Sequence, residues 1–332
     1  MAFRMKAVRS ILPKVATEFL TFIFVIFIIP TIYCFELYVV IPTFYPLWSL
    51  WYTIHFVCGT FLMCNITSNF VAIICTDTSV KGLLLQSTLQ PHWHFCSVCE
   101  SVSPPRSWHC DTCNTCIIRR DHHCMFTGCC IGHYNYRFFL AFIIHLLIAT
   151  IYATYFNVYF MWDRINFEAP MTLLKIIFPL AMVAFGIDIS ETQLYLVLFL
   201  ITVMGMLFMV ALLIIHVNLI WHGTTTYEKN HKIRDYDFGW KQNFKDVIGE
   251  NWILACFFPF AQLKLRGDGI HWNTRNSWQL EASKSRWLFM FIVHTHKSLI
   301  YWVLTFITLF LWSVCKILNI IHCVHIHESF VS

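Results

Sequence analysis

Cysteine and histidine are concentrated in one polar stretch of this sequence, residues 94–137. Eight of the fifteen cysteines in the chain lie there. Structural zinc takes four ligands in a tetrahedron, usually thiolates and imidazoles, and Cys-x-x-Cys turns commonly present them. Such turns are formed here by Cys96 and Cys99, by Cys110 and Cys113, and by Cys113 and Cys116. The spacing therefore predicts bound zinc.

The same stretch holds more metal ligands than two zinc ions can use. Two tetrahedral ions need eight ligands, whereas the stretch offers eight cysteines and three well-placed histidines, His109, His122 and His123. Three of these side chains are therefore surplus. A cysteine among them would be a candidate nucleophile.

The tetrapeptide Asp121-His122-His123-Cys124 contains the parts of a nucleophilic site. A thiol becomes a useful nucleophile when a neighbouring base or cation stabilises its thiolate. A histidine can take the thiol proton if a carboxylate orients the ring, and the other histidine is then free to bind metal. The alternative is that all four residues bind zinc or support its ligands, and spacing alone leaves both interpretations open.

Long apolar segments flank this stretch and must position it. The 332-residue chain is 58% hydrophobic and 12% charged, against about 25% charged residues in ordinary globular domains. Apolar runs of about 20 residues are long enough to cross roughly 30 Å of hydrocarbon. We therefore predict an all-α polytopic membrane protein with the Cys-rich domain between spans two and three. The four predicted transmembrane helices are Phe19–Val40, Leu47–Ile74, Phe138–Phe160 and Leu194–Ile220.

The distribution of Lys and Arg predicts the orientation of the spans, because cytoplasmic loops carry an excess of positive charge. Basic residues gather at the N-terminus, in the Cys-rich stretch and after the fourth span, whereas residues 163–193 contain only Arg164 and Lys175. We therefore expect a cytosolic N-terminus, Cys-rich domain and C-terminal region. The net charge of +5 is modest and scattered, so we expect no nucleic-acid partner.

These expectations divide the chain into four parts. They are residues 1–75 with spans one and two, 76–137 with the zinc domain, 138–220 with spans three and four and a lumenal loop, and 221–332 with the C-terminal region. Two apolar segments need separate interpretation. Thr172–Gly186 is too short for a span and is typical of a re-entrant or interfacial segment. Leu299–Cys315 is a candidate fifth span, with a helix on the membrane surface as the alternative.

The complete motif resembles the signature of the DHHC zinc-finger protein palmitoyltransferases, four-span membrane enzymes that attach fatty acids to protein cysteines. The matching spacing is Cys96-x2-Cys99-x9-His109-Cys110-x2-Cys113-x2-Cys116-x4-Asp121-His122-His123-Cys124-x5-Cys130-x4-Asn135-x3-Phe139. Two later segments are similar to further family elements, Thr225–Glu228 to a Thr-Thr-x-Glu element and Asn243–Trp252 to an Asn/Gly-rich motif. The resemblance covers roughly residues 19–260.

The resemblance implies a role for each residue of the motif. One structural zinc is assigned to Cys96, Cys99, His109 and Cys116, and a second to Cys110, Cys113, His123 and Cys130. Among the remaining residues, Cys124 corresponds to the nucleophile, His122 to its base and Asp121 to the residue that orients the base. Thr226 corresponds to a residue that contacts the catalytic aspartate, and Asn251 to one that braces the C-terminal segment. Cys129 has no assigned role.

The resemblance also implies the reaction and its setting. A long-chain acyl group, palmitoyl above all, passes from acyl-coenzyme A to Cys124 and then to a cytosolic cysteine of a membrane-associated protein client, in a ping-pong sequence. The endoplasmic reticulum or the Golgi is the expected location. Both zinc ions are expected to be structural.

The sequence departs from the usual family pattern at several positions. Met125 and Phe126 stand where the family usually has Pro-Trp, and Trp108 stands where it commonly has histidine. These changes resemble a divergent branch, the one that contains palmitoyltransferase member twenty-four of the human series. They leave open an alternative function, that of a catalytically weak membrane scaffold or client-binding protein.

Two further function classes fit the sequence less well. A membrane-bound RING-type ligase would need a closing Cys-x-x-Cys pair after the histidines, and Cys129-Cys130 does not supply one. A transporter is disfavoured because the predicted spans contain only one charged residue, Glu36. His145 and His216 lie in the third and fourth predicted spans, where we expect a histidine bonded to a neighbour in its own helix rather than a relay.

Overall fold

The computed structural model describes residues 12–85, 88–165, 171–251, 254, 257–258 and 264–275. Within these residues, four helical segments are long and apolar enough to cross a membrane. Their bounds are Ala16–Phe44, Leu50–Cys75, Tyr136–Trp162 and Glu191–Trp221. Each overlaps one predicted span, so the prediction of four apolar spanning helices is confirmed. The candidate fifth span at Leu299–Cys315 lies outside the described residues.

The first spanning segment is not one regular α-helix. It comprises α1 (Ala16–Phe35), the π-helical segment η2 (Glu36–Val40) and α2 (Ile41–Phe44). The other three are α3 (Leu50–Cys75), α4 (Tyr136–Trp162) and α7 (Glu191–Trp221). Serine caps begin α3 and α7, because the side chains of Ser49 and Ser190 accept hydrogen bonds from backbone N–H groups in the first turn.

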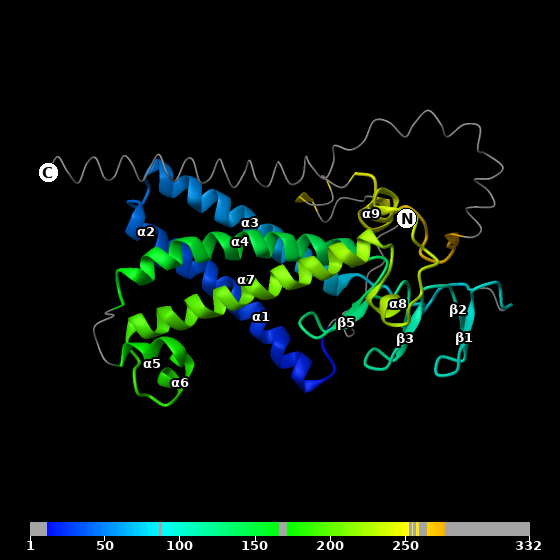
Figure 1. Cartoon of the computed structure of the whole chain (residues 1–332), viewed down its shortest axis with the longest axis horizontal. Helices are drawn as coiled ribbons and strands as arrows, with labels where there is room; N and C mark the ends of the chain where they lie inside the picture. Colours follow the sequence, from blue (N-terminus) through cyan, green and yellow to red (C-terminus); the bar gives the residue numbers. More distant parts are fainter. Residues whose placement is uncertain are drawn as a thin grey trace. The chain divides into compact units, whose positions relative to one another are not determined.

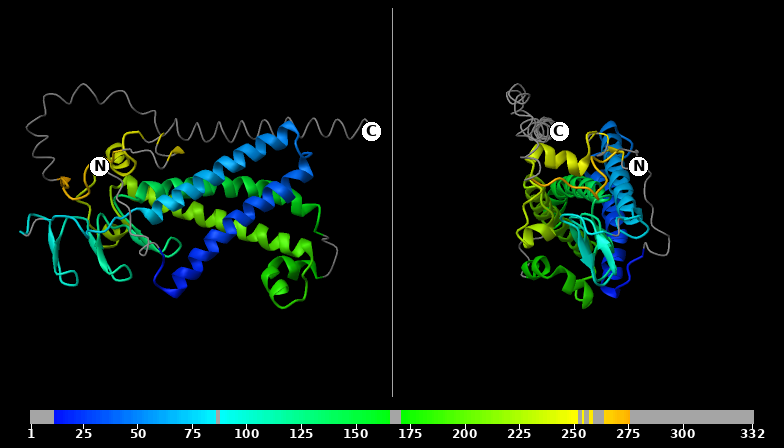
Figure 2. Two further views of the ribbon diagram at one scale, coloured as in Figure 1. Left: turned by 180° about the vertical axis from the view of Figure 1, so that it is seen from behind. Right: turned by 90° about the vertical axis from the view of Figure 1, so that its right-hand side faces the viewer.

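Helix α4 is the central helix of the bundle, and it packs against both α3 and α7 (Figures 1 and 2). Burial of apolar side chains from all four spans stabilises this packing. The shared core includes Phe22 from α1, Phe70 from α3, Phe142 from α4 and Met209 from α7. It continues into the Cys-rich domain, which it therefore fixes to the bundle.

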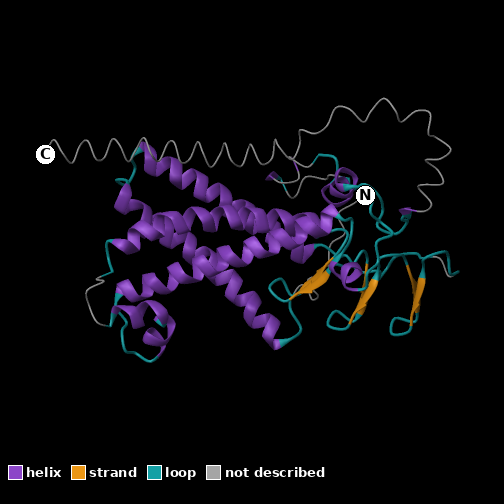
Figure 3. Ribbon diagram, in the orientation of Figure 1, coloured by secondary structure: helices purple, strands orange, loops and turns teal. Residues whose placement is uncertain are grey.

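The Cys-rich domain is made of three antiparallel β-hairpins (Figure 3). They are β1 with β2 (His94–Cys96, Ser101–Ser103), β3 with β4 (Trp108–Cys110, Thr115–Ile117), and β5 with β6 (His122–Cys124, Cys129–Ile131). The all-α prediction is therefore wrong for this part of the chain. Each strand is only three residues long, too short to produce the alternation of polar and apolar residues that marks a strand in sequence.

Shorter helices lie at both ends of the bundle. Helices α5 (Thr172–Ile177) and α6 (Pro179–Ala184) lie at the end away from the hairpins, and neither is long enough to span (Figure 1). Helices α8 (Thr226–Asn230) and α9 (Trp240–Ile248) follow α7 and lie at the hairpin end (Figures 1 and 2). The chain therefore brings the segment after the fourth span back to the Cys-rich domain.

Candidate active site and metal centres

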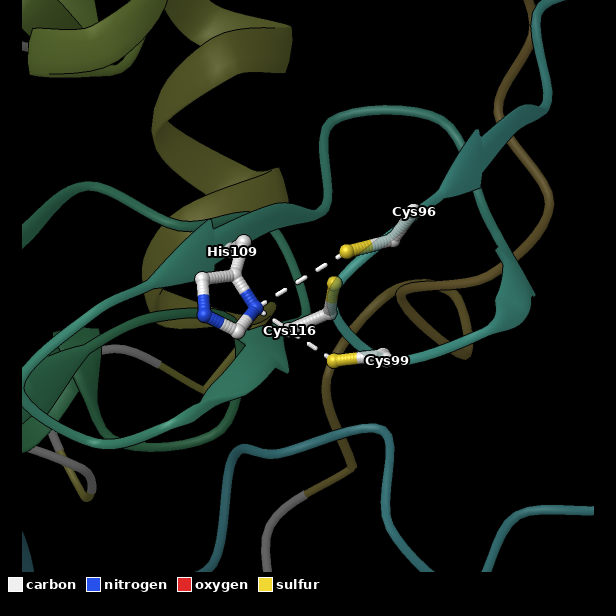
Figure 4. A group of neighbouring side chains, drawn as sticks. All are labelled: Cys96, Cys99, His109 and Cys116. Carbon is white, nitrogen blue, oxygen red and sulfur yellow. Dashed lines mark hydrogen bonds between the residues drawn. The ribbon is translucent and has the colours of Figure 1, made fainter.

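The first candidate metal centre joins two neighbouring hairpins. Cys96 and Cys99 come from the β1–β2 hairpin, while His109 and Cys116 face each other across β3 and β4. The four ligand atoms lie within 4.8 Å of one another. Figure 4 shows the sulfur atoms and a ring nitrogen of His109 directed toward one another; His109 Nδ1 lies 3.8 Å from Cys96 Sγ and 3.3 Å from Cys99 Sγ.

The second candidate centre joins the middle hairpin to the third. Cys110 ends β3 and Cys113 lies in the turn between β3 and β4, while His123 and Cys130 face each other across β5 and β6. His123 Nδ1 lies 3.6 Å from Cys110 Sγ, 3.4 Å from Cys113 Sγ and 3.5 Å from Cys130 Sγ. The middle hairpin thus contributes to both centres and ties the three hairpins together.

Both sets of ligands fit a tetrahedral zinc ion. Zinc bonds of about 2.3 Å to sulfur and about 2.0 Å to nitrogen place neighbouring ligand atoms roughly 3.5–3.8 Å apart. The nitrogen-to-sulfur distances in both centres, 3.3 to 3.8 Å, are close to this spacing. Each centre could therefore bind zinc with three cysteines and one histidine, and neither includes Cys124.

Asp121 connects the third hairpin to the segment after the fourth span. Its Oδ2 lies 2.7 Å from Nδ1 of His122 and accepts a 2.9 Å hydrogen bond from Thr226 Oγ1. The backbone N–H of Thr226 donates to Oδ1, also at 2.9 Å. The buried carboxylate is thus held from two sides, and it fixes the His122 ring with Nε2 left for another partner.

The side chains around Cys124 favour a charged pair. Burial opposes ionisation of Asp121, but the hydrogen bonds from His122 and Thr226, with the charges of His122 and His216, together outweigh it and hold the pKa of this carboxyl below its ordinary value. Burial would lower the pKa of His122, yet pairing with Asp121 and Cys124 raises it to about 9. Burial also disfavours the thiolate of Cys124, but the adjacent His122 lowers the pKa of the thiol. The site therefore favours a thiolate beside an imidazolium.

Cys124 lies where the third hairpin meets the spanning helices. Its side chain is 8% exposed and belongs to the same buried apolar cluster as Phe22, Phe70 and Phe142. Phe126, which replaces the usual tryptophan, packs against Phe208 of α7 with ring centroids 5.5 Å apart. A nucleophile in this position has polar support on one side and apolar side chains of the spans on the other.

His216 of α7 is a residue whose position the sequence did not predict. Instead of bonding within its own helix, its Nδ1 forms a 2.8 Å hydrogen bond with the hydroxyl of Tyr136 in α4. Its ring lies tilted by 41° against that of His122, with centroids 5.6 Å apart, and its ligand atom lies within 4.8 Å of those of Asp121 and His122. By contrast, His145 bonds to Ala141 O in its own helix, at 2.7 Å, as expected.

A buried ion pair holds the Thr-Thr-x-Glu segment against the Cys-rich domain. Arg106 donates from Nε and Nη2 to the two carboxylate oxygens of Glu228, at 2.6 and 2.7 Å. Glu228 also completes a capping box with Thr225 at the start of α8. The next residue after the cap is Thr226, so this ion pair positions the threonine that contacts Asp121.

We expect the Arg106→Met variant to lose stability by about 3–5 kcal/mol, because it leaves the buried Glu228 carboxylate without its partner. Thermal unfolding of the purified protein in detergent measures this loss. The double variant Arg106→Met/Glu228→Gln removes the uncompensated charge and should be more stable than the single variant. Replacement of the exposed Lys229 by Met is the control. An Arg106→Met variant with the same unfolding temperature as the wild type would contradict a stabilising role for the Arg106–Glu228 ion pair.

The segment Gly267–Trp272, which begins Gly-Asp-Gly-Ile, packs on the Cys-rich domain. The Trp272 ring lies 4.6 Å from the guanidinium carbon of Arg106 and 5.4 Å from that of Arg119. Gly269 adopts a positive φ of +77°, and a Cβ there would come within 2.6 Å of the His133 ring. Only glycine allows this close approach without displacement. Asn251, predicted to brace the C-terminal segment, is exposed, and its role stays a prediction.

Comparison with known proteins identifies the family. The family model described as DHHC palmitoyltransferase matches residues 89–233. The chain is 35% identical to "Probable palmitoyltransferase ZDHHC24" of Danio rerio over 71% of this chain and 81% of the relative. It is 32% identical to the Homo sapiens protein of the same name, over 69% and 81%. "Palmitoyltransferase ZDHHC22" of Danio rerio is 30% identical over 50% and 56%.

The match to the family model includes both candidate metal centres and the tetrapeptide that contains Cys124. They confirm the resemblance found in the motif, including the similarity to the branch with member twenty-four. The chain therefore belongs to the DHHC palmitoyltransferase family and is a protein S-palmitoyltransferase.

Proposed function

We propose that this enzyme transfers a long-chain acyl group from acyl-coenzyme A to protein cysteines through a covalent intermediate on Cys124. The Cys124 thiolate attacks the thioester carbonyl, coenzyme A leaves as a thiol after protonation, and an acyl-enzyme thioester remains. A client thiolate then attacks that thioester and regenerates Cys124. The observation that carries this proposal is the hydrogen-bonded series Thr226, Asp121 and His122 next to a cysteine outside both metal centres.

His122 has a role in each step of this proposal. It takes the thiol proton of Cys124 and returns a proton to the departing coenzyme A thiolate. In the second step it takes the proton of the client thiol. Asp121 keeps the ring in one tautomer and stabilises the imidazolium. These are the roles proposed for Asp121, His122 and Cys124.

We also propose that the two Cys/His centres bind structural zinc. Four protein ligands would complete the tetrahedron in each centre, which would leave no open position for water or substrate. Bound zinc would hold the short hairpins in place. Two-stranded hairpins this short are marginally stable by themselves, so the ligand side chains would keep the Cys124 loop in a fixed position at the end of the helices.

The apolar surroundings of Cys124 suit a fatty acyl substrate. Each buried methylene contributes about 0.8 kcal/mol, so contact with side chains of the spans would supply much of the affinity. Positive charge at the N-terminus, in the Cys-rich domain and after the fourth span supports a cytosolic location for all three. We propose membrane-associated clients with cytosolic cysteines, and residence in the endoplasmic reticulum or Golgi.

Replacing Thr226 with valine should slow acylation of Cys124 roughly 10- to 100-fold, because a hydrogen bond to a charged group contributes about 1.5–3 kcal/mol. The variant keeps the backbone hydrogen bond to Asp121 and loses only the one from Oγ1. The measurement is the single-turnover rate of coenzyme A release from palmitoyl-coenzyme A by the purified protein.

The Thr226→Ser variant is the matched control, since it keeps the hydroxyl and should keep most of the rate. Loss of the Oγ1 bond also weakens support for ionised Asp121 and hence for the His122 imidazolium. The pKa of the Cys124 thiol should therefore rise, and the acidic limb of the rate profile should move to higher pH in the valine variant. Equal rates and profiles for wild type and valine variant would show that Thr226 does not support Asp121.

A further inference from the structure

The zinc-binding histidine of the second centre has a partner in the first span. His123 directs Nδ1 toward the three thiols of its centre. Its other ring nitrogen, Nε2, lies 3.0 Å from Oε1 of Glu18 in the first turn of α1. The two residues are 105 positions apart in the sequence, and the motif itself does not include Glu18.

Glu18 is held in this position by its surroundings. Its side chain is only 9% exposed, whereas Thr17 beside it is exposed. Three residues later, Thr21 Oγ1 donates a 2.8 Å hydrogen bond to the backbone oxygen of Met125. Pro13 also packs closely on Gly128, where an added Cβ would come within 2.4 Å of its ring. The beginning of α1 thus contacts the Cys124 loop as well as the metal centre.

A carboxylate on the far nitrogen of a metal-binding histidine has a known physical effect. It accepts a hydrogen bond from Nε2–H, which fixes the tautomer that presents the Nδ1 lone pair to the metal, and it makes the ring a better ligand. Burial strengthens this interaction, because the local dielectric is lower than that of water. A buried carboxylate is costly without a partner, so the contact also favours burial of this end of α1.

We propose that Glu18 is a positioning residue for the second zinc centre, and that through it the first span holds the hairpin that carries Cys124. This inference rests on the proposed zinc binding and goes beyond it. Glu18 orients His123, which lies next to Cys124 in the same strand. Loss of Glu18 therefore weakens the second centre selectively and loosens the reactive loop.

The first centre supplies a matched comparison. There, Nε2 of His109 lies 3.7 Å from Oδ1 of Asp111, but the Asp111 side chain is fully exposed. A longer contact in water contributes little. Each histidine thus has a carboxylate partner, buried for His123 and exposed for His109. Only the buried carboxylate, Glu18, should affect metal retention.

The test measures zinc release from the full-length chain purified in detergent. Zinc content is determined first, and loss to an excess of a coloured chelator is then followed over time in wild type, Glu18→Gln, Glu18→Ala and Asp111→Asn. In the Glu18 variants we expect one of two zinc equivalents to leave roughly 10- to 100-fold faster, since loss of such a partner lowers metal affinity by about this factor. The zinc equivalent of the first centre should leave at its wild-type rate in these variants. Both equivalents should leave at the wild-type rate in Asp111→Asn.

Substitution with cobalt(II) adds a readout that mere loss of helix packing would not change. The visible absorption bands of tetrahedral cobalt respond to ligand orientation, and the isosteric Glu18→Gln variant should alter half of the signal. Wild-type release and wild-type spectra in both Glu18 variants would overturn the positioning role. A wild-type chain that holds fewer than two zinc ions would instead overturn the zinc assignment, and the role of Glu18 with it.

Discussion

The Cys124→Ser variant is expected to lose all hydroxylamine-sensitive labelling by a palmitate analogue. A serine hydroxyl has a far higher pKa than a thiol, so His122 cannot generate a comparable nucleophile at neutral pH. Removal of an enzymic nucleophile typically lowers the rate by about 10⁴-fold or more. The measurement is in-gel detection of the label on wild type and variant, before and after hydroxylamine, which cleaves thioesters.

Cys129→Ser is the matched control for this experiment. Cys129 faces Cys124 across the same hairpin, is 4% exposed and belongs to neither metal centre. The Cys129→Ser variant should therefore still be labelled, because Cys124 is intact. Equal labelling of the Cys124 variant and wild type would refute the proposed intermediate. Absence of label on wild type would favour the alternative that Met125 and Phe126 belong to a catalytically weak scaffold.

The parts of this site that are close together in the sequence, and the apolar helices around it, could be predicted from the sequence. Residues in Cys-x-x-Cys turns and in one tetrapeptide are neighbours by chain connectivity, so their grouping follows from spacing and from the family motif. The structure gathers the same two sets of four ligands that the resemblance implied. Spanning helices are equally accessible to prediction, because the bilayer requires about 20 consecutive apolar residues.

The parts that sequence did not predict depend on contacts between distant segments. Arg106 and Glu228 are 122 residues apart, and each by itself is an ordinary charged residue of a loop or helix start. His216 was expected to bond within its own helix, but the packing of α4 against α7 brings Tyr136 to it. No local periodicity in the sequence indicates such pairs. The strands could not be predicted either, because each is only three residues long and too short to show an alternating pattern.

Removal of zinc is expected to unfold the three hairpins and abolish labelling while the spanning helices persist. Structural zinc contributes about 10–16 kcal/mol to the folding of zinc-finger peptides, far more than three short hairpins provide through their own hydrogen bonds. The helices should survive, because their packing rests on apolar side chains such as Phe70, Phe142 and Met209. Limited proteolysis within residues 94–137 and far-ultraviolet circular dichroism measure the two parts separately.

A single ligand substitution makes the same test without a chelator. Cys113→Ser removes one thiolate from the second centre, whereas Cys64→Ser changes an exposed cysteine of α3 outside both centres. The first variant should hold one zinc equivalent fewer, expose the hairpins to protease and lose the palmitate label, and the second should behave as wild type. Full labelling of a stable protein that lacks both zinc ions would contradict a structural role for the metal. The hydrogen bonds of Asp121 and the packing of α1 would then have to position Cys124 without it.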